Sequence, residues 1–365
     1  MKIAILTFFE SDNYGTVLQA YALQHYLNLQ GHQAELLYIK RDIHCKSTHY
    51  AASVADETIF ERALQKFVAL YHRKDNARKA ERFQSFREHH LHIGDFCDTD
   101  EVLFAQLEKY DLFLNGGDQI WNPYHKSFSY RYMFDFLPEA SRRAAYGSSF
   151  GIKQIDNPQI KNSMAELLSK YNAVSVRDES GVRILADMGI SANYVLDPVF
   201  LLSAETWKAL TGDRLCKKRY CLVYALSDYG KTEERQIRHF AKERNLEVIV
   251  MPENRRNRTN HFHKAFDASP QDFINLIYHA DYVFTNSFHG MAFSILFQKQ
   301  FFLLQSTSAE AKDKYIRLTD LLEILRIGER NFSKNTQEID YSEIQQKLNT
   351  YRQDSLNYLN NIVLE

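Results

Sequence analysis

The stretch TNSFHGMAFSILF, residues 285–297, places polar residues between two apolar runs. The first run has the length of a buried strand and the second has the length of a helix. His289 could donate a proton or stabilise developing charge near neutral pH, or it could be a packed, hydrogen-bonded cap. A helix beginning here would direct N–H groups near Ser287 toward a phosphate or carboxylate, and Gly290 would let backbone approach it closely.

Two further charged residues could do chemistry on an anionic ligand. Arg177 follows the apolar run AVSV, and its planar guanidinium matches a carboxylate or phosphate with two hydrogen bonds. The alternative is an ion pair with Asp178 or Glu179 that caps the next helix. Asp118 closes the turn NGGD and is a candidate catalytic carboxylate; the alternative is a tight loop that requires glycine.

The elements that must position these residues alternate between strands and helices. KIAILTFF reads as a strand, TVLQAYALQHYLNLQG as a helix and AELLYI as a second strand, which makes a βαβ unit. The alternation continues to VFLL, and a second series runs from YCLVYALS to FFLLQS. We therefore predict an α/β protein with two doubly wound, Rossmann-like domains facing a cleft.

The domain boundaries follow from the same pattern. We predict an N-terminal domain over 1–198 and a C-terminal domain over 199–335. The charged segment 58–91 reads as a helical excursion from the first domain. It could be a solvated amphipathic helix pair, a cover over an acceptor site, or a surface for a lipid-linked substrate. Residues 341–364 read as a helix with one buried face that could pack back on the N-terminal domain.

Ligands of open parallel sheets bind outside the carboxyl ends of the strands. Five polar loops occupy such ends, and one loop alone would mean little in an α/β protein. They contain Asp12, Asn13, Tyr14 and Gly15; Asn115, Gly116, Gly117 and Asp118; Ser148 and Ser149; Arg177 and Asp178; and Ser287, His289 and Gly290.

Composition excludes several classes of function. The formal net charge of -1 argues against general nucleic-acid binding. The four cysteines form no CxxC pair and no zinc-like spacing, so we interpret them as reduced thiols of a cytosolic protein. No apolar run is long enough to span a membrane, and the N-terminus is too short for a signal peptide. Walker A, GxGxxG and HExxH motifs are absent from the sequence.

Seven stretches together resemble the polysaccharide pyruvyl transferases, in the same order along residues 1–325. They are DNYGTVLQAYAL, LNGGDQIWNP, YGSSFG, SVRDESGVRIL, VLDPVFLL, TNSFHGMAFSILF and KYIRLTDLL. The resemblance implies a fold like that of the GT-B glycosyltransferases, phosphoenolpyruvate as donor, and a sugar of a surface or exported glycan as acceptor. The product would be a pyruvate ketal. Neither a metal nor another cofactor is expected.

The resemblance also implies an acceptor side in the N-terminal domain and a donor side in the C-terminal domain, and it implies roles for individual residues. His289 would protonate the donor, Arg177 would hold its carboxylate or phosphate, and Asp118 would accept the proton of the attacking hydroxyl. The remaining implied ligands are Ser287, Gly290 and Arg317 on the donor side, and Asn13, Tyr14, Asn115, Gly116 and Gly117 on the acceptor side. The long 58–91 segment departs from many members of the family and leaves the acceptor open.

Two other functions share these features. A GT-B glycosyltransferase that uses a nucleotide sugar would have the same two domains, and a non-catalytic glycan-binding module could keep the same fold. We expect a cytoplasmic location, with the inner face of the membrane and a lipid-linked oligosaccharide acceptor left open.

Overall fold

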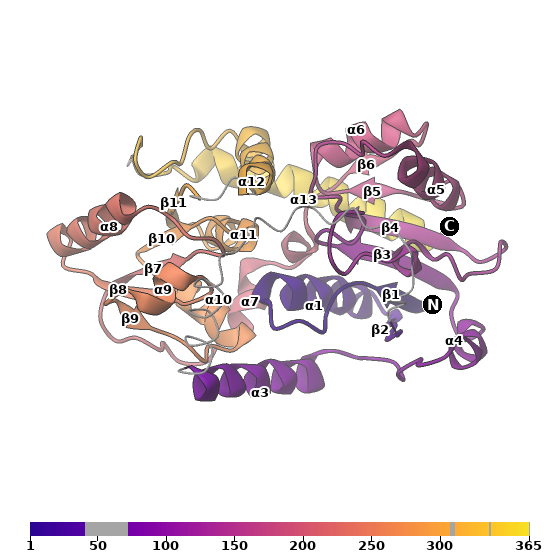
Figure 1. Cartoon of the computed structure of the whole chain (residues 1–365), viewed down its shortest axis with the longest axis horizontal. Coiled ribbons are helices and arrows are strands. Elements are labelled where there is room, and N and C mark those ends of the chain that lie inside the picture. The colour runs from indigo at the N-terminus through magenta and orange to yellow at the C-terminus, as the bar shows by residue number, and fades with distance from the viewer. Residues whose placement is uncertain (41–71, 307–310, 336, 365) are drawn as a thin grey trace, which may run out of the picture. The chain divides into compact units, whose positions relative to one another are not determined.

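A computed structural model describes the chain over residues 1–40, 72–306, 311–335 and 337–364, without the side chains of residues 255 and 311–317 (Figure 1). The chain divides into two compact units. Unit 1 takes in Met1–Ala55, Glu88–Leu201 and Asn349–Glu365, and unit 2 takes in Asp56–Arg87 and Leu202–Leu348.

Unit 1 contains a six-stranded parallel sheet in the order β2-β1-β3-β4-β5-β6. Its strands are β1 (Lys2–Leu6), β2 (Gln33–Leu36), β3 (Leu112–Gly117), β4 (Arg143–Ser148), β5 (Ser175–Val176) and β6 (Asn193–Tyr194). Every residue of β3 and β4 is buried, as expected for central strands of a sheet covered on both faces.

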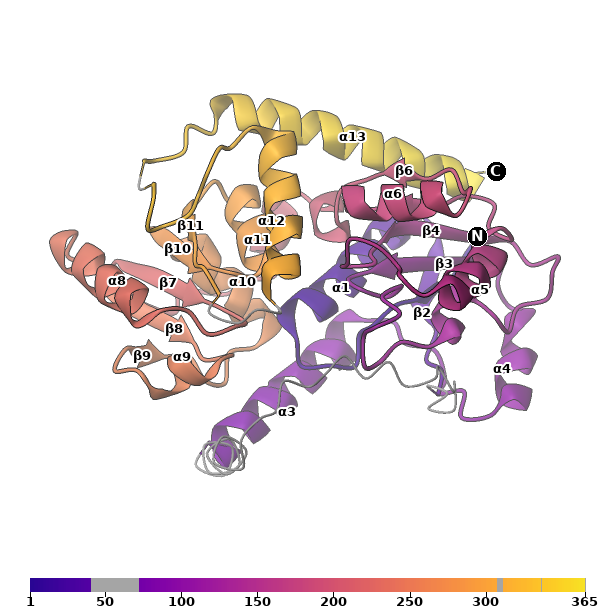
Figure 2. The ribbon, with the colours of Figure 1, turned by 45° about the horizontal axis from the view of Figure 1, so that its top comes forward.

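The helices of unit 1 begin at side-chain caps. The elements are α1 (Tyr14–Leu29), α4 (Asp100–Leu107), η1 (Tyr130–Met133), α5 (Pro158–Leu168), α6 (Glu179–Asp187) and η2 (Pro198–Leu201). Asn13, Thr99, Asn157 and Asp178 each accept a backbone N–H of the α-helix that follows. Helix α1 is buried along most of its length and lies against the sheet (Figure 2).

Unit 2 contains a five-stranded parallel sheet in the order β11-β10-β7-β8-β9. Its strands are β7 (Tyr220–Tyr224), β8 (Glu247–Met251), β9 (His263–Lys264), β10 (Tyr282–Thr285) and β11 (Gln300–Leu303). Its helices are α7 (Ala204–Ala209), α8 (Lys231–Glu243), α9 (Arg255–Thr259), α10 (Pro270–His279), α11 (Phe288–Leu296) and α12 (Ala311–Leu325). The ring of Phe240 on α8 packs edge-on against Phe284, Phe302 and Phe332, which fixes this helix on the sheet.

Helix α3 (Arg73–His90) is the described part of the predicted excursion, and residues 58–71 lie outside the described residues. We expected it to belong to the first domain, but residues through Arg87 group with unit 2. Ion pairs explain the difference. Lys79 contacts Glu253 at 2.6 Å, and Arg82 contacts Asp272 at 2.7 Å.

The last helix, α13 (Ser342–Leu364), ends in unit 1. The backbone N–H of Leu196 donates to Ser355 Oγ at 2.9 Å, and Tyr358 Oη donates to the carbonyl of Ala145 at 3.3 Å. The end of the chain therefore packs on the N-terminal sheet. Within the described ranges, no helix combines the length and apolar character needed to cross a membrane.

Candidate active site

Each sheet has one topological switch point. There, the connections from two adjacent central strands run in opposite directions along the sheet. In unit 1 it lies between β1 and β3, and in unit 2 it lies between β7 and β10. The crevice at such a point, outside the carboxyl ends of the strands, is where open α/β sheets bind ligands. Most of the predicted residues follow β1 or β10 or lie at the carboxyl end of β3, so the sequence patterns placed them at these two points.

The loop after β1 supplies the start of helix α1. Asn13 Oδ1 accepts the N–H of Thr16 at 3.1 Å, which makes Asn13 the N-cap. Tyr14, the first helical residue, is 1% exposed. Both residues thus shape the switch point of unit 1, and a contact with an acceptor stays a prediction for them.

The NGGD motif forms the carboxyl end of β3, with Asp118 as the first residue after the strand, and it is held tightly inside the fold. Asn115 is fully buried, donates to the carbonyl of Leu6 at 3.3 Å and accepts from the hydroxyl of Tyr171. Burial raises the pKa of Tyr171, so this hydroxyl keeps its proton and remains a donor. The Asn115 side chain is therefore used to join β3 to β1 and to Tyr171.

Gly116 and Gly117, at the end of β3, have no room for a larger side chain. A Cβ atom at Gly116 would lie 2.8 Å from the carbonyl oxygen of Tyr146. Gly117 has φ +132°, and a Cβ there would lie 2.5 Å from Thr7 Oγ1. Both glycines lie in β3 and not in the expected loop, and close packing there accounts for them and brings Asp118 to the end of the strand.

Asp118 and Arg177 lie in direct contact. Arg177 Nη2 is 2.6 Å from Asp118 Oδ1, and its Nη1 pairs with Asp197 Oδ2. The side chains of Arg177 and Asp197 are 1% and 0% exposed, whereas that of Asp118 is 24% exposed. The guanidinium thus lies behind a carboxylate that reaches the surface, and two carboxylates share one cation.

The alternative partners of Arg177 have other contacts. Asp178 Oδ1 caps α6 through the N–H of Gly181, and its Oδ2 accepts from Ser149 Oγ at 2.6 Å. Glu179 pairs with Arg183 at the surface. Ser149 lies at the centre of a GxSxG spacing, Gly147 to Gly151, but its buried hydroxyl donates to a carboxylate, which does not suit a nucleophile.

Three buried polar groups near the end of β3 have unpaired atoms, and two of them, Thr7 and Gln19, were not predicted from the sequence. Thr7 Oγ1, Gln19 Nε2 and Ser148 Oγ have no hydrogen-bond partner within the described part of the chain. Gln19 Oε1 accepts the N–H of Asp118 at 2.8 Å, which places its amide beside the candidate base. Buried polar groups are nearly always paired. Unpaired ones at a switch point therefore indicate a polar ligand. The polar Gln19 amid the apolar residues of α1 was the available signal.

The switch point of unit 2 is formed by the start of α11. Ser287 Oγ accepts the N–H of Gly290 at 3.4 Å, and its own N–H donates to Thr285 Oγ1 at 3.0 Å. A Cβ atom at Gly290 would lie 2.4 Å from Thr285 Oγ1, so glycine lets the helix begin directly over the strand. His289 lies in the first turn, 4% exposed, with its ring edge-on to Phe288.

Asn286 ties the two loops of this switch point together. Its Oδ1 accepts the N–H of Leu226 at 2.7 Å, and its Nδ2 donates to the carbonyl of Ser227 at 3.0 Å. The loop that carries His289 is therefore fixed to the loop after β7.

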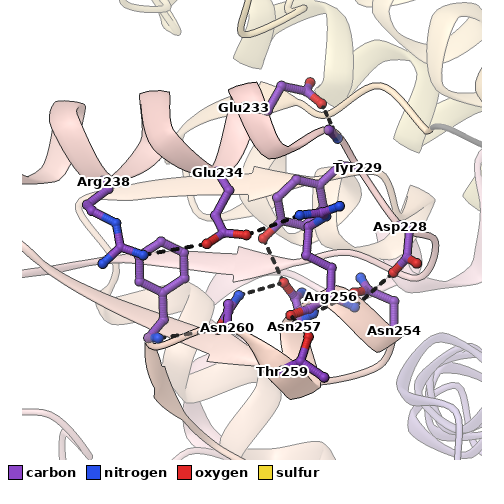
Figure 3. Close-up of polar contacts among 12 residues, drawn as sticks. Asp228, Tyr229, Glu233, Glu234, Arg238, Asn254, Arg256, Asn257, Thr259 and Asn260 are labelled. Atoms are coloured by element: carbon purple, nitrogen blue, oxygen red, sulfur yellow. Dashed lines mark hydrogen bonds and ion pairs between the residues drawn. The ribbon is translucent and has the colours of Figure 1, made fainter. Parts of the chain in front are cut away.

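A polar network extends from the loop after β7 to α9 (Figure 3). Asn254 Nδ2 donates to the carbonyl of Ala225 at 2.6 Å, and Asp228 Oδ1 accepts the N–H of Arg256 at 2.9 Å. Arg256 Nη1 contacts Glu234 Oε2 at 3.3 Å, with its guanidinium 5.9 Å from the ring centre of Tyr229. The polar stretch ENRRNR, directly after the apolar run LEVIVMP, was the sequence signal for this network.

Two predictions are not tested by the described contacts: the donor contact of Arg317 and the shared site of His289 and Arg177. Arg317 belongs to α12, and its side chain lies outside what the structure describes. His289 belongs to unit 2 and Arg177 to unit 1, and each is placed only within its own unit. A search of the described residues for three or more His, Cys, Asp or Glu side chains able to hold a metal found no such group.

The fold defines a class of protein. UDP-N-acetylglucosamine 2-epimerase from Rickettsia bellii is 12% identical, with a TM-score of 0.51 over 100% of this chain and 95% of that one. The corresponding enzyme from Methanocaldococcus jannaschii is 10% identical, with a TM-score of 0.50 over 96% and 92%. The chain thus has the GT-B-like fold of such epimerases.

The family follows from the sequence match. The family model of the polysaccharide pyruvyl transferases matches residues 13–308. No curated protein matches the chain. The protein therefore belongs to the polysaccharide pyruvyl transferase family, as the motifs indicated.

Proposed function

We propose that the protein transfers pyruvate from phosphoenolpyruvate to a sugar of a surface or exported glycan and forms a cyclic ketal. Membership of the polysaccharide pyruvyl transferase family carries the proposal. The residue types at the switch point of each unit support it, because Asp118 in unit 1 is a candidate base and His289 in unit 2 is a candidate acid.

The reaction needs one acid, one base and no redox step. The acid adds a proton to the methylene carbon of the enol phosphate, which leaves a positive charge shared between C2 and the bridging oxygen. A sugar hydroxyl adds to C2 and gives up its proton. The bond between C2 and the phosphate oxygen then breaks, and a second hydroxyl adds to close the ketal. Of the two hydroxyl protons, one restores the acid and one leaves with phosphate.

His289 is the proposed acid and Asp118 the proposed base. His289 lies in the first turn of α11, where backbone N–H groups favour an anionic donor. Asp118 is the partly exposed member of the carboxylate pair around Arg177. The burial of Arg177 favours a positioning role behind Asp118 over a direct grip on the donor, and the donor contact of Arg177 stays a prediction.

The acceptor would contact the unit 1 switch point. Thr7, Gln19 and Ser148 offer hydroxyl and amide groups of the kind that bind sugar hydroxyls, in addition to the predicted Asn13. We propose the cytoplasm as the place of reaction, with a lipid-linked acceptor at the inner face of the membrane. The expectation of reduced cysteines is consistent with this location.

A donor comparison tests the proposal before the acceptor is known. We expect phosphoenolpyruvate to raise the melting temperature of the parent protein, and UDP- and ADP-sugars to leave it unchanged. A response to nucleotide sugars alone would favour a glycosyltransferase. Binding of glycans with no phosphate release at any acceptor would favour a binding module. Either result would overturn the proposed function.

A further inference from the structure

A hollow in unit 2 lies at the end of the sheet opposite to that of His289. It has a volume of about 780 Å³. Its walls come from the residues just before β7, β10 and β11 and from the end of α10, so it lies outside the amino ends of the strands. Arg214, Arg219, Tyr278, His279, Asp281 and Lys299 supply its polar lining.

The hollow gathers positive charge. Lys299 Nζ and Lys208 Nζ lie 5.3 and 5.2 Å from the ring centre of Tyr278. Neither ammonium has a carboxylate partner among the residues that the structure describes. Arg214 donates only to neutral groups in that part of the chain, the carbonyls of Cys216 and Lys218 at 2.7 and 3.0 Å.

The one carboxylate of the described lining is already used. Asp281 Oδ1 accepts from Arg219 Nε at 2.9 Å and Nη2 at 2.7 Å, and its Oδ2 accepts the N–H of Tyr220. Arg214 and Lys299 therefore line the hollow, and Lys208 lies beside its Tyr278 wall, all three without a bonded carboxylate in the described part of the chain.

Besides burial, the nearby positive charges also lower the pKa values of two lining residues, His279 and Lys299. Burial lowers the pKa of His279, and Arg214, Lys299 and Lys208 lower it further. Burial likewise lowers the pKa of Lys299, to which Arg214 adds and which Asp281 opposes. A multiply charged anion would relieve this repulsion.

We propose that this hollow binds a phosphate-bearing ligand through Lys208, Lys299 and Arg214. A phosphate or diphosphate group carries more than one negative charge, and ammonium groups bind phosphate as point charges. The aromatic wall of Tyr278 and Phe297, whose ring centres are 5.2 Å apart, would contact whatever the phosphate is attached to. The site does not depend on the proposed pyruvyl transfer.

The source of the phosphate can be a lipid headgroup or a free molecule, and two probes separate them. Inorganic pyrophosphate is titrated into the purified full chain by calorimetry. Vesicles of phosphatidylcholine, with and without phosphatidic acid, are tested by co-sedimentation. Lys208→Gln with Lys299→Gln removes both ammoniums, while Lys231→Gln with Lys242→Gln removes two exposed charges from α8 as the matched control.

We expect one pyrophosphate-binding event, or the retention on phosphatidic acid vesicles, to weaken at least about tenfold in the first double variant and to persist in the control. Lys299→Arg should keep it. Binding of pyrophosphate at the donor site would survive in both double variants, which separates the two sites. The proposal is overturned if neither probe binds the parent, or if both double variants, folded by circular dichroism, behave alike.

Discussion

At the scale of single residues, the Arg177 contact gives the sharpest expectation for stability. Arg177→Met would leave Asp197 buried with its cation removed, and breaking a buried pair costs about 3–5 kcal/mol. Arg183→Met is the control, because its pair with Glu179 is exposed and such pairs contribute about 0–1 kcal/mol. Urea unfolding of both variants measures the difference. Equal losses would mean that the buried pair is not a structural requirement.

The unpaired Thr7 hydroxyl predicts a trade between stability and function. Thr7→Val removes a buried polar group without a partner, so the free energy of unfolding should stay the same or rise. Acceptor-dependent turnover should fall if the hydroxyl binds the sugar. Both quantities are measured on one preparation. A destabilised variant with parental turnover would show that Thr7 serves the fold instead.

Only some of the residues of the candidate site could be predicted from the sequence. Asp118 and Ser287 could be found because each follows an apolar run. The partner of Arg177 could not, since Asp197 reaches it only through the order of β4, β5 and β6 in the sheet. Thr7 and Gln19 lie inside apolar runs, where the polarity of one side chain is a weak local signal against a core position.

At the scale of elements, the start of α11 depends on glycine. A Cβ at Gly290 meets Thr285 Oγ1 and the Tyr224 ring, so Gly290→Ala should force the helix off the strand and cost about 1–3 kcal/mol. Gly212→Ala is the control, because nothing lies within 4 Å of a Cβ there. Thermal unfolding compares them. A neutral Gly290→Ala would contradict the close packing of α11 over β10.

The long parallel strands were predictable as elements and the short ones were not. Runs such as YCLVY are apolar throughout because both faces of the sheet are covered. Strand β9 has two residues, His263 and Lys264, and no apolar run marks it. The grouping of α3 with unit 2 depends on ion pairs with Glu253 and Asp272, distant in sequence, and therefore could not be predicted.

At the scale of the whole molecule, half-buried histidines set the response to acid. Burial lowers the pKa values of His25, His90 and His279 below 6.5, so the unfolded chain binds more protons than the folded one as the pH falls through 6.5. Stability should therefore decline from pH 7.5 to 5.5, before carboxylates titrate. Urea midpoints across this range measure it, and His25→Gln should flatten the slope. A midpoint that rises on acidification would contradict the lowered values.

The central claim concerns His289 as the acid of pyruvyl transfer. The most direct measurement is phosphate release from phosphoenolpyruvate with a glycan acceptor, with donor affinity measured in parallel, for the parent, His289→Gln and the exposed control His261→Gln. We expect the first variant to fold and bind the donor, with turnover reduced about a hundredfold to ten-thousandfold, and the control to match the parent. A His289→Gln protein that forms ketal at the parental rate, stable or not, would contradict the assignment.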